Sequence, residues 1–306
     1  MSIERVVDIA GEGRHLSLKR GFLLVSHGGQ ELGRVPLDDI VAVIVHGFGA
    51  SLSANVLAAL AQRNVFVVLC DQTQNPTACL WPLSGHHAQG ARMRAQIAAG
   101  LPLKKRLWQQ IVRAKIGAQA AAIDTIGLPV MPLLRMQKNV RSGDPDNLEA
   151  QAARHYWPRL MGADFRRERA QGGANAMLNY GYAVLRAATS RAIVASGLHP
   201  TIAVHHSAGQ NDMALADDLM EPFRPFVDMA VRNLTFAGAV EVCHEVKAIL
   251  AGLLDADVEM GHGISTIGVA IKRTAQSLSQ CFVQSEAALD LPTPPPPVQW
   301  AALGRA

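Results

Sequence analysis

The sequence has few cysteines, and none of them stands in a pattern that binds metal. Its 306 residues include only Cys70, Cys79, Cys243 and Cys281, which are widely spaced and form neither a CxxC pair nor a Cys/His zinc motif. This spacing argues against a zinc module and against a disulfide-stapled domain. We therefore expect four reduced cysteines that pack in the interior.

Long apolar runs and nucleotide-binding glycine loops are also missing. No segment reaches the roughly 18 apolar residues of a membrane helix, and the N-terminus lacks the order of a secretory signal, so we expect a cytoplasmic protein. Neither GxGxxG nor GxxxxGK[ST] occurs. The sequence therefore gives no sign of chemistry driven by a bound nucleotide.

Acidic residues are absent from residues 72–123, although basic residues are frequent there. A second basic cluster lies at 154–169, within a chain whose formal net charge is only +4. Concentrated positive charge suits a polyanion partner, and solvated helix faces are the alternative explanation. If the partner is DNA, binding should weaken steeply with salt. The residues we expect to contact its phosphates are Arg92, Lys104, Lys105, Arg106, Arg113, Lys115, Arg154, Arg166 and Arg167.

The first part of the chain has the pattern of a β-rich domain. Runs typical of strands lie at 15–18, 22–26, 31–36, 40–45 and 65–69, and Gly28 and Gly29 predict a hairpin turn. Between the last two strands, Ser53 is a suitable N-cap for a short helix that ends near Asn64. We predict an N-terminal β-rich domain over residues 1–84.

Residues 85–90 are predicted to be a linker, because helical periodicity begins beyond them. Helices are expected at 103–126, at 145–157 with Asp144 as N-cap, and at 174–196, 217–234, 240–254 and 264–289. The predicted fold class is α+β, with the small β-rich domain followed by a larger all-α domain over 91–289. The prolines near the end predict a flexible, extended tail over 290–306.

One stretch, 205–225, combines two histidines, several carboxylates and a helix start. Asp217 is a plausible N-cap, and Asp218 and Glu221 then lie three residues apart on one helix face. Such carboxylates, with His205 or His206, suit a hard divalent ion, but acidic residues also gather at helix starts to cap them. Glu149 is a further candidate, with an ordinary first-turn glutamate as the alternative.

Three separated stretches form a wider pattern: DNLEAQAARHYW at 146–157, NAMLNYGYAVLR at 175–186, and the stretch 205–225. In order and separation they resemble the CRISPR adaptation integrase family, and in particular its branch in type II systems. Residues 103–108 and 111–116 are similar to the first long helix of that branch. The resemblance covers nearly the whole chain except the proline-rich tail.

The resemblance implies a dimerising N-terminal domain and a helical catalytic domain. It places three ligands of Mg²⁺ or Mn²⁺ on Glu149, His206 and Glu221, which are then also the catalytic residues. His206 fits the spacing to Glu221 better than His205, and Asp218 becomes a supporting carboxylate that binds metal or orients a ligand. The region 209–213 is less like the family, which leaves DNA contacts there open.

The implied reaction is transesterification, in which a 3′-hydroxyl of a captured DNA fragment attacks a phosphodiester of the repeat array. The implied partners are double-stranded DNA, a second copy of the chain, and a small adaptation protein that bridges two dimers. A neutral His206 as ligand predicts a loss of activity below roughly pH 6. The alternatives are a metal-dependent nuclease or branched-DNA resolvase that only hydrolyses, and a DNA-binding scaffold without catalysis.

Overall fold

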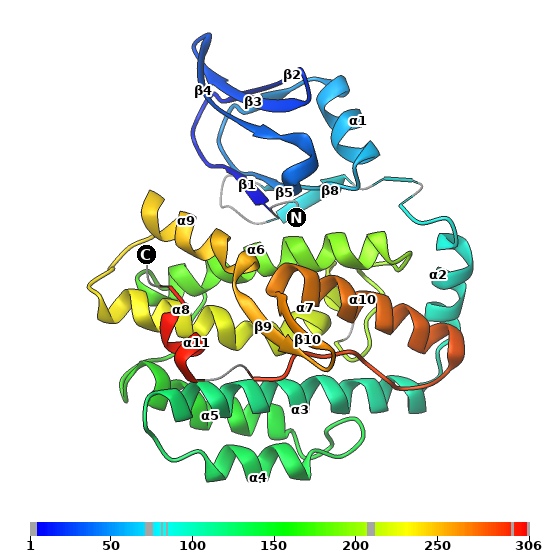
Figure 1. Ribbon diagram of the computed structural model, residues 1–306, viewed down its shortest axis with the longest axis vertical. Helices are drawn as coiled ribbons and strands as arrows, with labels where there is room; N and C mark the ends of the chain where they lie inside the picture. The colour runs from blue at the N-terminus through cyan, green and yellow to red at the C-terminus, as the bar shows by residue number, and fades with distance from the viewer. Residues whose placement is uncertain are drawn as a thin grey trace.

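The computed structural model of the protein describes residues 5–70, 76–80, 82–83, 85–206, 212–294 and 297–304. Its N-terminal part contains two four-stranded sheets, and the remainder of the chain is mainly helical (Figure 1). The elements of the N-terminal part are β1 (Arg5–Ile9), β2 (His15–Lys19), β3 (Phe22–His27), β4 (Gln30–Pro36), η1 (Leu37–Asp39), β5 (Ile40–Val45), β6 (Ser51–Leu52), α1 (Ala54–Gln62), β7 (Phe66–Cys70) and β8 (Pro76–Leu80).

Local sequence signals account for several of these elements. β3 and β4 pair antiparallel as predicted, and the turn between them uses Gly28 and Gly29 with φ of 57° and 82°, a region that glycine adopts readily. The strand predicted at 40–45 coincides with β5, in which all side chains are buried. Ser53 caps α1 as expected, since its side chain accepts a hydrogen bond from Val56 N–H at 3.4 Å.

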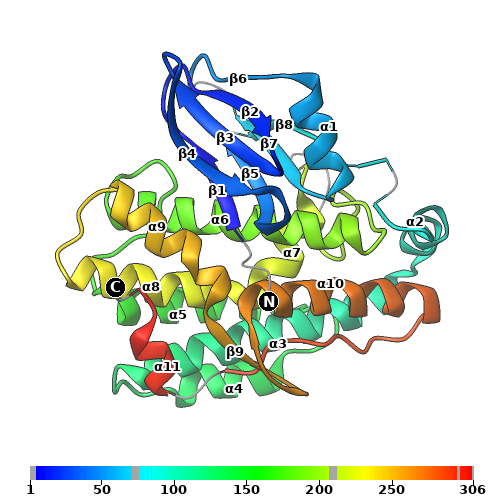
Figure 2. The ribbon, with the colours of Figure 1, turned by 45° about the horizontal axis from the view of Figure 1, so that its top comes forward.

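The two sheets are stacked, and the inner one packs against helices of the C-terminal part. The inner sheet, of order β1-β5-β7-β8, lies between the outer sheet, of order β4-β3-β2-β6, and helices α6 and α9 (Figure 2). Side chains alternate along β5: Val43 joins a core with the outer sheet and α1, whereas Ala42 and Ile44 join the large helical core. The division at residue 84 stays a prediction, because this core includes residues from both parts of the chain.

The helical part begins at Gln89, inside the predicted linker. Its elements are α2 (Gln89–Ala98), α3 (Leu101–Thr125), α4 (Met131–Asn139), α5 (Leu148–Met161), α6 (Ala174–Ala195), α7 (Ala214–Met220), η2 (Glu221–Phe223), α8 (Arg224–Phe236), α9 (His244–Gly252), η3 (Leu253–Asp255), β9 (Asp257–Met260), β10 (Gly263–Thr266), α10 (Ile267–Gln284) and α11 (Pro297–Ala302). The predicted class, a β-rich region followed by a mainly helical one, is confirmed, with the small hairpin β9–β10 as an addition.

Three helix predictions need correction. The helix expected at 217–234 is divided into α7, η2 and α8, because Pro222 and Pro225 interrupt the regular backbone hydrogen bonds. Asp217 is not an N-cap, since α7 already begins at Ala214. The helix predicted from 264 begins only at Ile267, where Thr266 caps it, and the preceding residues form β10.

The predicted flexible tail is wrong. The segment contains helix α11, in which Trp300 is fully buried and its ring stacks on Phe226 with ring centroids 4.6 Å apart. The Asn233 side chain donates hydrogen bonds to the carbonyls of Ala301 and Leu303. Burial of an indole therefore ties the end of this segment to α8.

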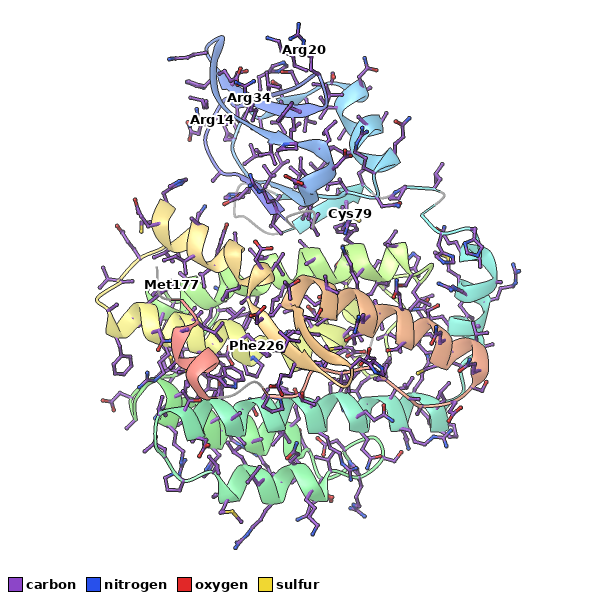
Figure 3. All side chains as sticks on the ribbon, viewed as in Figure 1. Arg14, Arg20, Arg34, Cys79, Met177 and Phe226 are labelled. Carbon is purple, nitrogen blue, oxygen red and sulfur yellow. The ribbon has the colours of Figure 1, made fainter. Side chains whose placement is uncertain are left out.

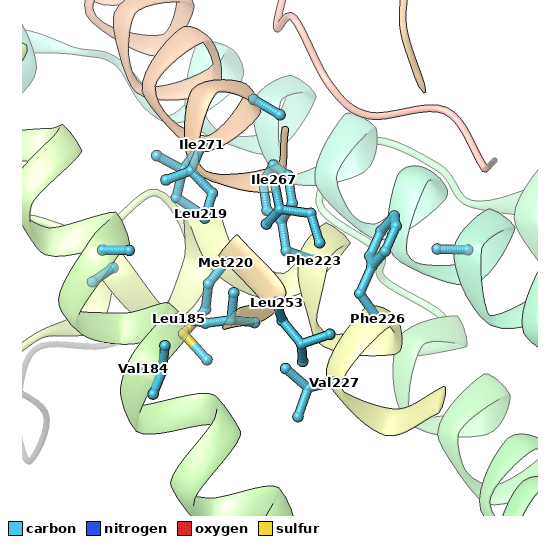
Figure 4. Close-up of a cluster of buried hydrophobic side chains, with 14 of the residues drawn as sticks. Val184, Leu185, Leu219, Met220, Phe223, Phe226, Val227, Leu253, Ile267 and Ile271 are labelled. Carbon is cyan, nitrogen blue, oxygen red and sulfur yellow. The ribbon is translucent and has the colours of Figure 1, made fainter. Parts of the chain in front are cut away.

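A cluster of apolar side chains holds α7, η2 and α8 in place. Figure 4 shows Leu219, Met220 and Phe223 between Leu185 of α6 and Ile267 of α10. α8 approaches α6 closely because Gly181 has no side chain, and a Cβ there would lie 2.4 Å from Val227 Cγ1. This packing fixes the segment that carries Asp217, Asp218 and Glu221.

All four cysteines are free thiols; Cys281 is buried and the others are half-buried. Cys79 lies where the inner sheet meets the helices and packs against the large core (Figure 3). Over the described ranges, no helix is both long and apolar enough to cross a membrane.

Candidate active site

The candidate site is built from four segments that are distant in the sequence. Glu149 lies in the first turn of α5, His206 ends the segment that precedes α7, and Glu221 is the first residue of η2. Helix α3 runs between them and contacts α5, α7 and η2. The structure thus brings the predicted ligand set around the middle of α3.

The N-terminus of α5 is fixed by two side chains. Asn147 caps the helix with φ of 51°, and its side chain accepts a hydrogen bond from Ala150 N–H. Asp144, the predicted N-cap, lies three residues earlier and accepts hydrogen bonds from the N–H groups of Leu148 and Glu149 at 2.9 and 3.0 Å. Because two side chains bind its free N–H groups, the first turn of α5 is held in place, and with it the backbone of Glu149.

Lys115 of α3 joins the two glutamates. Its Nζ lies 2.6 Å from Glu149 Oε1 and 2.5 Å from Glu221 Oε2. Lys115 is only 9% exposed, so our prediction that it contacts DNA phosphates is not supported by its position in this structure. Burial disfavours the ammonium, but the charges of Glu221 and Glu149 outweigh it and raise the pKa of Lys115 above its ordinary value.

Arg224 supplies a second cation to Glu221. Its Nε lies 3.1 Å from Glu221 Oε1, and its guanidinium lies over the ring of Tyr182, 4.9 Å from the centroid. Burial raises the pKa of Glu221, but the charges of Arg224 and Lys115 lower it by more, so the carboxyl is ionised. The sequence alone indicated no role for Arg224, although it lies one helical turn after Glu221.

Asp218 forms hydrogen bonds with both histidines of the pair. Its fully buried carboxylate accepts hydrogen bonds from the N–H groups of Val204, His205 and His206, and from His206 Nδ1 at 2.5 Å. The hydrogen bond from Asp218 raises the pKa of His206 despite burial. Since Nδ1 is engaged, Nε2 is the nitrogen of His206 that remains for a ligand.

His205 and His206 have different surroundings. His205 stacks on Trp108 of α3 with the ring centroids 4.2 Å apart and the planes at 3°, and burial lowers its pKa. His206 meets the same indole edge-on, and its side chain is 42% exposed. Trp108, which the sequence analysis did not single out, therefore separates the two histidines by packing one of them.

The donor chemistry of Glu149, His206 and Glu221 suits a hard divalent ion, because two carboxylates and one imidazole are ligands that Mg²⁺ or Mn²⁺ accepts. A cation, Lys115 Nζ, already lies between the carboxylates. Within the described part of the chain, no three histidine, cysteine or carboxylate side chains stand close enough together to hold a metal as they are. The three side chains are therefore of a chemical type that suits the ion. In this structure the Lys115 ammonium lies between the two carboxylates.

Tyr182 and Asp228 form a buried pair next to the site, which the sequence did not reveal. The Tyr182 hydroxyl donates a hydrogen bond to Asp228, which is 2% exposed. Burial raises the pKa of Asp228 to about 7 and that of Tyr182 well above its usual range. Because Tyr182 also carries Arg224 on its ring, this pair helps to position the cation that binds Glu221.

The predicted DNA-contacting residues fall into two groups. Several bind the protein itself: Arg92 donates to the Ser196 carbonyl, Arg113 to Val140, Arg166 to Ala163 and Phe165, and Arg167 to Asn175 and Asn179. Lys105, Arg106 and Arg154 are exposed, and Lys104 is half-buried. The departure from the family pattern at 209–213 lies partly outside the described residues.

Two surface hollows adjoin each other along α3. One, of about 370 Å³, is lined by Leu101, Pro102, Lys105, Arg106 and Ser142. The other, of about 660 Å³, is lined by Gln109, Arg113, Lys138, Asn139, Val140, Arg141, Ser142 and Asp146. They share Ser142, in the loop that leads to Asp144 and the start of α5, so exposed positive charge extends toward the site.

Comparison with known proteins yields consistent matches. The family model described as CRISPR associated protein Cas1 matches residues 7–129 and 135–250. The CRISPR-associated endonuclease Cas1 of Neisseria meningitidis serogroup C (strain 8013) is 39% identical over 231 residues, 75% of each chain. A casposase solved bound to an integration product superimposes with a TM-score of 0.78 at 22% identity, covering 94% of this chain and 92% of that one. A Cas6-RT-Cas1–Cas2 complex contains a chain with a TM-score of 0.75 at 16% identity, covering 95% of this chain and 36% of that one.

Proposed function

Because the chain belongs to the CRISPR-associated Cas1 family, we propose that it is a metal-dependent DNA endonuclease and integrase of CRISPR adaptation. It joins 3′-hydroxyl ends of captured DNA fragments to the repeat array. The observation that carries the proposal is the pair of carboxylates, Glu149 and Glu221, held around one cation beside a histidine oriented by Asp218. The similarity to the Neisseria relative supports the type II branch.

In this reaction Glu149, His206 and Glu221 hold the divalent ion, and Asp218 orients His206. When bound there, Mg²⁺ or Mn²⁺ would supply positive charge against the negative charge that develops on the attacked phosphate. The 3′-oxygen forms a new bond to phosphorus while the existing P–O bond to the repeat strand breaks, so one phosphodiester replaces another. No external energy source is needed.

The exposed basic residues supply the DNA contacts. Lys105 and Arg106 line the first hollow along α3, where they position phosphates without reading sequence. Arg154 adds positive charge on α5, the helix that carries Glu149. Arg113 and Arg166 are exposed as well and can add contacts, whereas Arg92 and Arg167 are half-buried and are held by the protein contacts described above.

The assembly is part of the same proposal. The outer sheet and the edge strand β4, whose residues 30–34 are exposed, form the surface through which two copies dimerise. A small adaptation partner bridges two such dimers. Support comes from the Cas6-RT-Cas1–Cas2 complex, in which a chain of this fold occurs together with Cas2.

Strand joining tests the proposal. A labelled DNA fragment, a repeat-bearing supercoiled plasmid, the adaptation partner and Mn²⁺ are incubated with the wild type, His206→Ala or Glu221→Gln. We expect joining by the wild type and its loss in both variants. His262→Ala and Glu286→Gln are the matched controls, because both residues are exposed and lie outside the site.

The same assay separates the rival functions. Cleavage without covalent joining indicates a nuclease or resolvase that uses water as the nucleophile. DNA binding with no reaction, unchanged in Glu221→Gln, indicates a scaffold. Joining that survives in His206→Ala contradicts its role as a required ligand and directs attention to His205.

A further inference from the structure

The candidate site contains its own cation. The side chain of Lys115 is 11% exposed, and its ammonium bonds Glu149 and Glu221, whose side chains are 22% and 4% exposed. A lysine placed for DNA binding would present its ammonium to solvent. Lys115 instead directs its ammonium inward, to the two carboxylates proposed as metal ligands.

The fold explains why a cation is required there. Lys115 lies on the same face of α3 as Ile111 and Trp108, one and two turns earlier, and all three are buried against the helical core. Glu221 enters this region from η2, and Glu149 from α5. Two carboxylates so close together in a poorly solvated region repel each other strongly unless a positive charge lies between them.

The formal charges at this point balance. Lys115 and Arg224 carry one positive charge each, and Glu149 and Glu221 one negative charge each. The carboxylate of Asp218 is stabilised separately, by hydrogen bonds from three backbone N–H groups and from His206. A divalent ion that enters therefore meets a neutral group of four side chains and not a net negative one.

Charge balance has a consequence for metal affinity. The attraction of the two carboxylates for a divalent ion is offset by the repulsion from the two protein cations, so the protein alone binds the ion weakly. A DNA phosphate adds the missing negative charge and gives the displaced ammonium a new acceptor. The lysine side chain suits this exchange, because its ammonium is a point charge on a flexible stem.

We propose that Lys115 is a built-in counter-ion that holds Glu149 and Glu221 together in the metal-free protein and makes divalent-metal binding depend on a DNA phosphate. The inference rests on the proposed function, because it takes these glutamates as metal ligands. It assigns Lys115 a positioning and gating role at the site, in which its ammonium meets a DNA phosphate only after the metal ion has displaced it. The protein then avoids forming a loaded metal site before its substrate is present.

Metal binding measures this role directly. Mn²⁺ is titrated into the full-length protein by calorimetry, with free Mn²⁺ followed by electron paramagnetic resonance, in the absence and presence of a double-stranded oligonucleotide. Binding of Mn²⁺ to the oligonucleotide alone is subtracted. The proteins are the wild type, Lys115→Met, Lys115→Arg and the control Arg273→Met, which replaces an exposed basic residue of α10.

We expect DNA to tighten Mn²⁺ binding to the wild type by roughly tenfold or more, since one unit charge acts over a few ångströms. Lys115→Met should bind Mn²⁺ roughly tenfold or more tightly than the wild type without DNA, and gain little from DNA. Lys115→Arg, which keeps the charge, should retain the DNA dependence. Arg273→Met should match the wild type.

The proposal is overturned if folded Lys115→Met binds Mn²⁺ no more tightly than the wild type without DNA. Circular dichroism and a thermal melt establish whether the variant is folded. If Lys115→Met does not fold, the wild type decides, because equal Mn²⁺ affinity with and without DNA also overturns the proposal.

A Glu221→Gln variant separates this inference from the function on which it rests. If Glu221→Gln binds Mn²⁺ like the wild type in both conditions, the metal site itself is wrong, and the proposed function fails with it. If Glu221→Gln loses Mn²⁺ binding but Lys115→Met leaves it unchanged, the metal site stands and only the role of Lys115 is refuted.

Discussion

The imidazole of His206 donates its Nδ1–H to Asp218, a carboxylate with no solvent exposure. The same carboxylate accepts the backbone N–H groups of Val204 and His205, so it cannot turn away from the ring. This contact fixes one tautomer of His206 and leaves the Nε2 lone pair for a ligand. One buried side chain thus sets both the direction and the basicity of the proposed metal ligand.

Replacement of Asp218 should therefore impair the reaction although Asp218 is not one of the three proposed ligands. We expect Asp218→Asn to lower the rate of strand joining by about 10–100-fold, the usual cost of losing such a supporting carboxylate. The rate is measured at saturating Mn²⁺, with Asp255→Asn, a change at an exposed residue of η3, as the control. A folded Asp218→Asn with the full wild-type rate would contradict this role.

The pH dependence follows from the same contact. The hydrogen bond to Asp218 raises the pKa of His206 above 6.5, and only the neutral imidazole binds metal. As pH falls, protonation of His206 begins at a higher pH than in an unperturbed histidine, so joining should decline above the limit of roughly pH 6 expected from sequence. A pH–rate profile at constant ionic strength measures it. A rate that stays constant down to about pH 6 is incompatible with this expectation.

The burial of Asp228 predicts that the free energy of unfolding depends on pH. Its pKa is raised by burial from 3.8 to about 7, so the folded state binds a proton that the unfolded state has released. The free energy of unfolding contributed by this group therefore falls as pH rises from about 4 to about 7, and is constant above that. Asp228→Asn should flatten this part of the curve, as measured by urea unfolding at several pH values. An unchanged slope would show that Asp228 is ionised throughout.

The C-terminal helix should contribute to stability. Trp300→Ala removes a fully buried indole that stacks on Phe226, and we expect it to lower the free energy of unfolding by about 3–5 kcal/mol. Phe236→Ala is the matched control, because that ring is 65% exposed. Urea denaturation followed by circular dichroism gives both values. If both variants lower the free energy of unfolding by the same small amount, the C-terminal segment does not contribute to stability.

DNA affinity should depend on the exposed basic side chains of α3. The double variant Lys105→Ala/Arg106→Ala should reduce the slope of log affinity against log salt by roughly 0.9 for each phosphate that the variant no longer neutralises. Arg273→Ala is the control, since Arg273 is an exposed residue of α10 that lines neither hollow. Fluorescence anisotropy over a range of salt concentrations measures the slope. The same slope in the double variant and the wild type would exclude these residues from the DNA-binding surface.

The sequence was informative where local rules decide the structure. The hairpin at Gly28 and Gly29, the strand at 40–45 and the cap at Ser53 are governed by neighbouring residues, and all three are confirmed. The two prolines that interrupt 217–234 are also visible in the sequence. Their effect was underestimated because the apolar spacing continues across them.

What the sequence could not show depends on contacts between distant segments. Nothing in the spacing of Lys115 reveals that Glu149 and Glu221, 34 and 106 positions later, meet its ammonium; from sequence it was one base in a basic cluster. Trp300 was assigned to a flexible tail because its partner, Phe226, lies on another helix. Only the resemblance grouped Glu149, His206 and Glu221, and it assigned no role to Asp228 or Trp108.

The inner sheet is covered on both faces, so over the described residues the sheets and the helices are packed against each other. Further ties cross the same boundary: Lys247 of α9 bonds Asp8 of β1 at 3.0 Å, and Arg191 of α6 donates to the Asn64 carbonyl. Through these contacts we expect a rotation applied at the outer sheet to be transmitted to α6 and on to the site. We therefore expect a partner that binds the outer sheet to influence the orientation of Glu149, His206 and Glu221.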